Sequence, residues 1–533
     1  MKIQFWTPHL VYRTHLLIIL LWLSIFGNVK ISRAQDYDPQ FFPIGVWSVK
    51  GDFRTVDDFL FDVNTAGTYH HTSFQNLHNG GFNAVFLSYD PIGYTLDTIL
   101  DIAELYDVKV IASMQHLHEV IEQSGSQAVT DAEITQAILN DSIERLKRSP
   151  VVLGYFLYDE PIPSWIDMNT LQRAKNLLAQ ITSDAPHPIL STWHDEALMD
   201  ELDSYLQPDV VMMVSYPFED GDSIGDVSDY MPSYFSSMPD PPPYSDYINT
   251  VRERHCDSIN RPMWVVLQAF GDVETPENGG YWRQVYPKEL RLEVYLAVMQ
   301  GAKGIWYFLY ESEYPYLLGL LDESGQPTVR LIEVEDVNEE LNVLAGTLLK
   351  LRVFQDQSAV QSNRGEVKMH YDSTDTSHPK YVIAVNTDVN ASQAIQITVN
   401  KNAIGYPVQG VENVYDHQAI NYTETTDSIS FTTVVEAGGG AVIRLSDTPL
   451  DIALQKNTQI RVYPNPTSDF LYIQHDFTSL ISYEIKDMQG KLIMTDRFLN
   501  NNSPIDLRKM SPGVYRIAVK TEKGIFVQKF IKW

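Results

Sequence analysis

Apolar runs alternate with amphipathic stretches over roughly the first 350 residues of this chain. Strands are expected where the runs are short, apolar and aromatic or β-branched, at residues 42–49, 84–89, 108–114, 151–158, 188–193, 209–216, 263–270 and 304–310. Helical periodicity between them predicts helices at residues 95–106, 131–148, 171–181 and 289–300. About eight such alternations predict a parallel (β/α)8 barrel. An open doubly wound sheet is the alternative, but no glycine-rich phosphate loop follows the first run.

The pattern changes after the barrel. Short alternating segments, punctuated by Asn, Asp, Ser and Gly, run through residues 351–447 and predict an antiparallel β-sandwich. We expect a structural role for this sandwich, because its strands show no dense aromatic face; a carbohydrate-binding module is the alternative. Residues 448–457 are expected to be a linker, and residues 458–533 another all-β unit. The predicted domains are therefore a signal at 1–34, a barrel at 36–350, a sandwich, a linker and a small all-β tail.

The N-terminus has the pattern of an export signal. Lys2 and Arg13 precede an apolar stretch at residues 16–27, and small residues end at Ala34, where cleavage is expected. The stretch is short for a membrane span, so a retained anchor is the alternative, and no later segment is apolar enough to cross a bilayer. The single cysteine, Cys256, excludes an internal disulfide.

Charge restricts the partners. The net charge is −30, from 39 basic and 69 acidic residues, which argues against nucleic acid because phosphate contacts need clustered Lys and Arg. The tail reverses this sign, with 11 Lys/Arg against 7 Asp/Glu from residue 458 onward. Such a reversal across a linker predicts an independent module.

Two adjacent carboxylates carry the candidate chemistry. Asp159 and Glu160 directly follow the fourth predicted strand and precede Pro161. In a barrel of this kind, chemistry takes place at the C-terminal ends of the strands. A partly desolvated carboxyl there has a raised pKa and is suited to protonate a leaving sugar oxygen. We therefore expect Glu160 to be the general acid of a glycosidase.

A second catalytic group is needed, and two candidates remain. Glu311 follows the eighth predicted strand, which faces the fourth strand across a closed barrel. Asp159 is the alternative, since an adjacent Asp-Glu pair suits hydrolases that use the acetamido group of the substrate as nucleophile. Aromatic and polar residues at other strand ends are expected to bind sugar: Trp47, Tyr89, Asp90, His116, Tyr158, Trp193, His194, Tyr216, Gln268 and Trp306. No metal or other cofactor is expected.

The tail resembles the C-terminal sorting domain of the type IX secretion system. Three segments carry the resemblance, in the order and spacing of that family: Val462–Thr467, Tyr483–Lys491 and Met510–Arg516. The resemblance implies a Gram-negative host of the Bacteroidetes kind, an interaction with the secretion machinery, and delivery to the cell surface or the medium. It says nothing about chemistry.

The barrel resembles the large clan of (β/α)8 glycoside hydrolases whose fourth strand ends in Asn-Glu-Pro. Here the triplet is Asp159-Glu160-Pro161, so Glu160 matches the acid/base residue and Asp159 departs from the clan. The nucleophile of the clan is a Glu at the end of strand seven, where this chain has Gln268, which cannot ionise. The resemblance implies a secreted hydrolase of a polysaccharide. The missing glutamate leaves a catalytically inactive surface glycan-binding protein, or a substrate-assisted hydrolase of N-acetylated sugars, as alternatives.

Overall fold

The structure is a computed structural model. It describes residues 41–47, 73–86, 96–185, 187–193, 196–220, 222–227, 242–273, 281–313 and 316–450, and in the tail 461–463, 467–474, 480–487, 492–497, 504–521 and 524–532. The expected export signal at residues 1–34 and most of the expected linker lie outside these residues.

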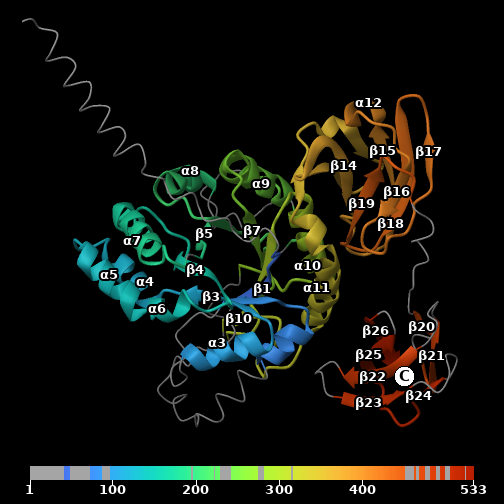
Figure 1. Ribbon diagram of the computed structural model, residues 1–533, viewed down its shortest axis with the longest axis horizontal. Helices are drawn as coiled ribbons and strands as arrows, with labels where there is room; N and C mark the ends of the chain where they lie inside the picture. Colours follow the sequence, from blue (N-terminus) through green and yellow to red (C-terminus); the bar gives the residue numbers. More distant parts are fainter. Residues whose placement is uncertain are drawn as a thin grey trace, which may run out of the picture.

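Eight parallel strands close into a barrel, which confirms the predicted fold class (Figure 1). In barrel order the strands are β1 (Ile44–Trp47), β2 (Ala84–Phe86), β3 (Lys109–Ser113), β4 (Val152–Tyr158), β5 (Ile189–Trp193), β6 (Val210–Val214), β7 (Met263–Gln268) and β9 (Gly304–Phe308). Each lies within one of the eight runs expected from the apolar pattern. The barrel closes where β1 pairs with β9, through Gly45 opposite Trp306.

Alternation along each strand separates the barrel interior from the layer beneath the helices. Trp264 and Trp306 are fully buried inside the barrel, together with Met212 of β6. The glycine at position 45 makes room for this packing, because a Cβ there would lie 2.4 Å from the Trp306 ring. The interior is therefore a packed core below the C-terminal ends of the strands.

Helices surround the barrel: α3 (Leu96–Leu105), α4 (Gln115–Gln123), α5 (Asp131–Asn140), α6 (Ile143–Leu146), α7 (Met168–Ile181), α8 (Glu196–Tyr205), α9 (Tyr244–Val251), α10 (Pro287–Met299) and α11 (Val329–Leu348). The single helix expected at residues 131–148 is wrong, because the chain breaks between α5 and α6. Asp141 accepts hydrogen bonds from the backbone of His116 and Leu117 at the start of α4, and Ser142 adopts a left-handed φ of 57°.

Two antiparallel sheets form the predicted sandwich. One has the order β11 (Leu351–Val353), β13 (Glu366–Asp372), β14 (Asp375–Val385), β19 (Gly440–Ser446), β16 (Gly410–Asn413); the other has β12 (Val360–Ser362), β15 (Gln393–Asn400), β18 (Ser428–Val435), β17 (Tyr422–Glu424). The first sheet packs on α10, where Tyr295 lies directly against Gly440. Figure 1 shows α10 and α11 between the barrel strands and the sandwich.

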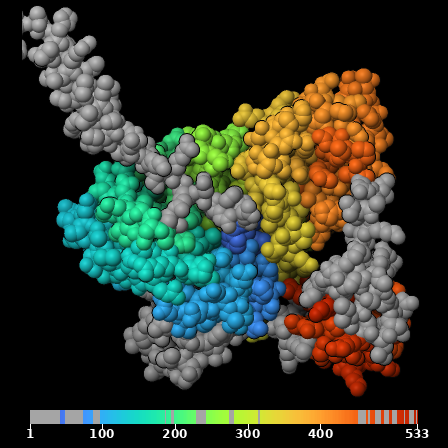
Figure 2. Space-filling view, in the orientation of Figure 1, coloured from blue at the N-terminus to red at the C-terminus, as the bar shows by residue number. Residues whose placement is uncertain are grey.

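The tail consists of β-strands (Figure 1) and forms a lobe apart from the sandwich in the space-filling view (Figure 2). Its strands are β20 (Arg461–Tyr463), β21 (Phe470–Gln474), β22 (Leu480–Asp487), β23 (Leu492–Arg497), β24 (Ile505–Asp506), β25 (Gly513–Thr521) and β26 (Gly524–Lys532). Its basic residues meet the acidic barrel at α11, where Arg516 pairs with Glu335 at 2.9 Å and Lys529 with Asp336 at 3.1 Å. Within the described parts of the chain, no helix combines the length and apolar character that a membrane span requires.

Candidate active site

Asp159 and Glu160 are joined by a hydroxyl from the next strand. The Thr192 Oγ1 donates to Asp159 Oδ1 at 2.5 Å and accepts the backbone N–H of Glu160 at 2.8 Å. Thr192 lies two residues after Leu190 on β5, so its side chain is on the same face of the strand as Leu190, which lies inside the barrel. Glu160 itself adopts a left-handed φ of 43°, which is uncommon for a residue with a Cβ and is often found at functional sites. The β5 hydroxyl therefore holds both residues at the C-terminal end of the barrel.

The protonation of Glu160 follows from this placement. Burial, and then the negative charge of Asp159, raise the pKa of Glu160 to about 8. Desolvation and a like charge both disfavour the carboxylate form. Tyr216 lies close enough for both carboxylates to raise its pKa, after burial as the first cause. A pKa of about 8 favours the protonated form of Glu160 at neutral pH, and its carboxyl lies near enough to Tyr216 to act on it electrostatically.

A group of aromatic side chains lies at the same end of the barrel, and we call it the aromatic mouth: Trp47, Tyr216, Phe270, Trp282 and Phe308. Tyr216 stacks on Phe308 with 5.9 Å between ring centroids and meets Trp282 edge-on at 6.1 Å. These three side chains are partly exposed. Such rings suit the apolar faces of sugars. Trp47 and Tyr216, which we predicted to bind sugar, belong to this group, and their contact with sugar stays a prediction, whereas sequence reasoning missed Thr192 and Phe308.

Gln268 has a structural position, so its predicted substrate contact is corrected. It is fully buried, its Oε1 accepts the Phe218 N–H at 2.8 Å, and its Nε2 donates to the Phe218 carbonyl at 3.1 Å. Its own backbone N–H donates to Glu293 Oε1 at 3.1 Å. Both ends of the amide are used to fix the segment after β6, which also carries Tyr216.

Replacing Gln268 with alanine is expected to destabilise the fold by about 1–3 kcal/mol, because the buried backbone groups of Phe218 would lose their partners. Urea unfolding measures the loss, and the exposed Gln355→Ala variant is the matched control. An unchanged free energy of unfolding combined with a raised KM would show instead that Gln268 contacts the substrate.

Three further candidates lie away from the aromatic mouth. Trp193 is fully buried under the helices, with its ring edge-on to His255 at 5.8 Å, and Trp306 is fully buried inside the barrel against Gly45. Buried side chains of this kind pack the core, so their predicted sugar contacts are corrected. His116 lies over the α5 end, where its Nδ1 is 2.8 Å from Asp141 Oδ1. This contact helps to hold the start of α4, and the contact of His116 with sugar stays a prediction.

Tyr158 faces the helix layer rather than the barrel interior. The pairing of β4 with β5 shifts in register between Phe156 and Tyr158, so the usual alternation is broken at the end of the strand. The Tyr158 ring lies against His118, with 4.3 Å between centroids. Burial lowers the pKa of His118, although Asp159 is among the charges that oppose this. His118, which was not among the predicted site residues, therefore lies near Asp159.

Glu311 lies in the segment after β9. It is 7% exposed, and its charge, after burial, raises the pKa of Tyr310, whose ring packs edge-on to Phe82 in the helix layer. Tyr89, Asp90 and His194, which we predicted to bind substrate, lie outside the described residues. Among the residues that the structure describes, no group of three His, Cys, Asp or Glu side chains is arranged to hold a metal ion.

Several solved structures resemble this one. A family 5 glycoside hydrolase from Bacteroides vulgatus is 12% identical, with a TM-score of 0.47, covering 79% of this chain and 91% of the other. A protein described as a glycoside hydrolase is 13% identical, with a TM-score of 0.47, covering 76% and 93%. A β-galactosidase from a psychrophilic Marinomonas is 12% identical, with a TM-score of 0.41, and this chain spans 62% of its length. At these values no residue role is carried over from them. No curated protein sequence matches the chain.

A family model identifies the tail. Residues 461–533 match the secretion system C-terminal sorting domain, which covers nearly all of the expected 458–533 unit. The match confirms the predicted destination, the cell surface or the extracellular space through the type IX system. It leaves the chemistry to the barrel. The protein is thus an eight-stranded parallel barrel and a β-sandwich joined to a type IX sorting domain.

Proposed function

We propose that the protein is a secreted glycoside hydrolase acting on a polysaccharide, with Glu160 as the general acid. The single observation that carries the proposal is a carboxyl with a pKa raised to about 8, placed beside the aromatic mouth at the C-terminal end of the barrel. Glycosidases need such a protonated carboxyl at neutral pH, next to surfaces that hold a sugar ring. The sorting domain supports a substrate found outside the cell.

Glu160 acts on the leaving group in this proposal. Its proton passes to the glycosidic oxygen while the bond between that oxygen and the anomeric carbon breaks, so the aglycone departs as an alcohol. The anomeric carbon then takes a nucleophile on its opposite face. When the incoming group is water, or when water resolves an intermediate, a basic group must accept its proton.

Asp159 is the second group that we favour, over Glu311. Its charge acts on both Glu160 and Tyr216, and the Thr192 hydroxyl fixes its carboxylate. A carboxylate next to the acid cannot attack from the opposite face, but it can orient and stabilise a substrate acetamido group that does so. This favours an N-acetylated sugar at the cleavage site. Glu311 remains the candidate for a direct displacement or for activating water.

The pH dependence of activity tests the acid. Because Glu160 must be protonated, we expect kcat/KM to fall as pH rises through about 8. In an Asp159→Asn variant the neighbouring negative charge is absent, ionisation becomes easier, and the alkaline limb moves to lower pH by roughly one unit. Initial rates of the wild-type protein and the Asp159→Asn variant from pH 5 to 10 measure the two alkaline limbs. If the alkaline limb does not move in the Asp159→Asn variant, the charge of Asp159 does not raise the pKa of Glu160.

The first experiment is a reducing-end assay on neutral, sulfated and N-acetylated polysaccharides. Release of new reducing ends by the purified protein supports hydrolysis, and the anomeric form of the first product separates inversion from retention. The absence of a glutamate at position 268 motivates one other function, a surface protein that binds glycans without cleaving them. Binding with no product across the whole set would favour that function.

A further inference from the structure

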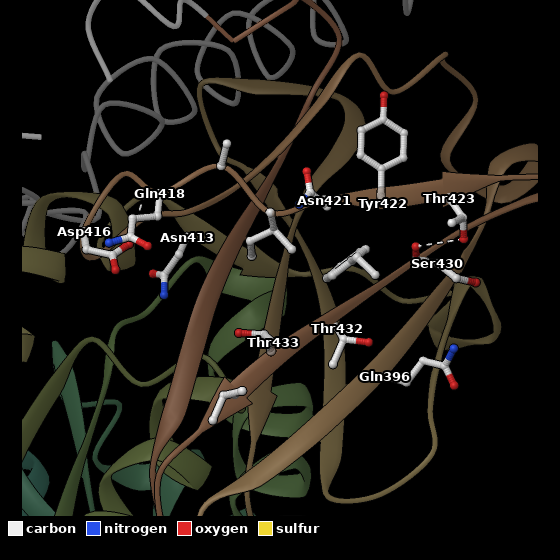
Figure 3. A pocket seen from close by; sticks show the side chains of 14 residues that line it. Gln396, Asn413, Asp416, Gln418, Asn421, Tyr422, Thr423, Ser430, Thr432 and Thr433 are labelled. Atoms are coloured by element: carbon white, nitrogen blue, oxygen red, sulfur yellow. Dashed lines mark hydrogen bonds between the residues drawn. The ribbon is translucent and has the colours of Figure 1, made fainter. Parts of the chain in front are cut away.

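The sandwich carries a polar groove at the edge of its four-stranded sheet (Figure 3). Its volume is ≈ 640 Å³, within the range of small-molecule sites. The lining is rich in amides and hydroxyls, including those of Gln396, Asn413, Asn421 and Thr432. Asp416 is the lone charged residue of the lining, which contains no Lys or Arg.

The groove exists because one edge strand is too short. β17 pairs with β18 only from Tyr422 opposite Phe431 to Glu424 opposite Ile429. Before Tyr422 the chain belongs to the other sheet, where the Ile420 N–H donates to the Val411 carbonyl at 2.7 Å. β18 continues to Val435 against β15. An opening is therefore left between the uncovered edge of β18 and residues 413–421.

Side chains from both walls face this opening. Gln396 and Thr432 are opposite each other on β15 and β18, and both are exposed, while Ile395, Ile397 and Phe431 fill the core of the sandwich. Figure 3 shows Asn413 and Gln418 on the other side. The two walls come from segments that are adjacent only in the folded chain.

The groove also offers apolar surface. Val434 is 73% exposed, an unusual state for a β-branched residue in a strand, and it lies beside the polar side chains. Tyr422 lies opposite Phe431 and its ring packs against the sandwich core, with its hydroxyl donating to the Val408 carbonyl at 3.2 Å, so Val434 supplies the exposed apolar surface. A sugar presents both C–H faces and hydroxyls, so it matches a surface of this mixed kind.

We propose that this groove is a second carbohydrate site, which binds a neutral segment of a polysaccharide independently of the barrel. Amides and hydroxyls both donate and accept, as sugar hydroxyls do. The lack of a cation in the lining, together with the carboxylate of Asp416 and the negative chain, disfavours anionic glycans. The sandwich then has a binding function, where the sequence predicted a structural one.

The test uses the full chain carrying Glu160→Gln, so that cleavage of the probes is strongly slowed. The groove variant combines Gln396→Ala, Asn421→Ala and Thr432→Ala, which are exposed positions that do not contribute to the core. The control combines three exposed positions outside the groove, Gln355→Ala, Asn402→Ala and Thr426→Ala. The probes are soluble arabinoxylan, mixed-linkage β-glucan and galactomannan, with alginate as the anionic comparison, in affinity electrophoresis.

We expect the Glu160→Gln chain with an unmodified groove to bind at least one neutral probe and to bind alginate more weakly. The groove variant should lose affinity by about tenfold or more, because several hydrogen bonds of about 1 kcal/mol each are removed, and the control should change less than about twofold. Equal affinity in groove variant and control, or no binding to any neutral probe, would overturn the proposal. So would a groove variant that loses self-association instead of sugar binding, since the open β18 edge would then serve strand addition.

Hydrolysis is measured separately, in chains that retain Glu160. The groove variant should keep its kcat on a short soluble substrate, because the groove belongs to the sandwich. If the wild-type protein cleaves nothing while the neutral probes still bind through the groove, the proposed hydrolase function fails and the second site stands.

Discussion

Replacing Glu160 with glutamine is expected to lower kcat/KM on a polysaccharide by about 10²–10⁴-fold. The amide has nearly the shape of the carboxylic acid but donates no acidic proton, so the leaving oxygen would depart as an anion. On a dinitrophenyl glycoside the kcat/KM of the same variant should fall far less, because that leaving group needs little protonation. The ratio of the two losses, measured by initial rates, reports whether Glu160 acts as an acid.

The control for this variant is Glu323→Gln, an exposed glutamate in the loop before α11. It should leave both activities unchanged. The pKa of Glu160 is raised in the folded state, so ionisation of this side chain at alkaline pH destabilises the fold. Glutamine cannot ionise, and the Glu160→Gln protein should therefore remain folded at alkaline pH. Equal losses on both substrates, with an intact fold, would remove Glu160 from proton transfer.

The second large effect is expected at Asp159. Its replacement by asparagine should lower kcat by about 10²–10³-fold, the size usual for removing a placed electrostatic group. The loss should be greatest on substrates with an acetamido group next to the anomeric carbon, because Asp159 would orient that group. Kinetics on a matched pair of substrates, with and without N-acetylation, measure this difference.

Glu311→Gln is the comparison that decides between the two candidates. If Asp159 is the partner of Glu160, the Glu311 variant keeps most of its activity. A larger loss for Glu311→Gln than for Asp159→Asn, on substrates of both kinds, would reverse the assignment. In that case the acid and its partner would be Glu160 and Glu311, which follow opposite strands of the barrel.

The architecture could be predicted well because burial acts on long stretches of sequence. β7, β6 and β4 are buried on both faces, and each is an almost unbroken apolar run that is recognisable without the structure. The helix boundaries were less predictable. The break after Asn140 depends on Asp141, whose partners lie 24 and 25 residues earlier in the chain.

The site was predictable only in part, because a strand end does not reveal the direction of each side chain. Trp193 and Thr192 are adjacent at the end of β5, yet the threonine bonds to Asp159 and the tryptophan packs under the helices. At Tyr158 a shift in strand register reverses the expected direction. A residue list built from strand ends therefore included core residues and omitted a threonine.

By itself, the sequence determined the barrel, the sandwich, the sorting tail and the position of a carboxylate pair after the fourth strand. Those properties depend on apolar periodicity and on local motifs, which neighbouring residues carry. Only the tertiary structure decided the proton affinity of Glu160, the makeup of the aromatic mouth and the presence of the sandwich groove. Each of these depends on groups far apart in the chain, because desolvation, charge and open strand edges arise only when those groups meet.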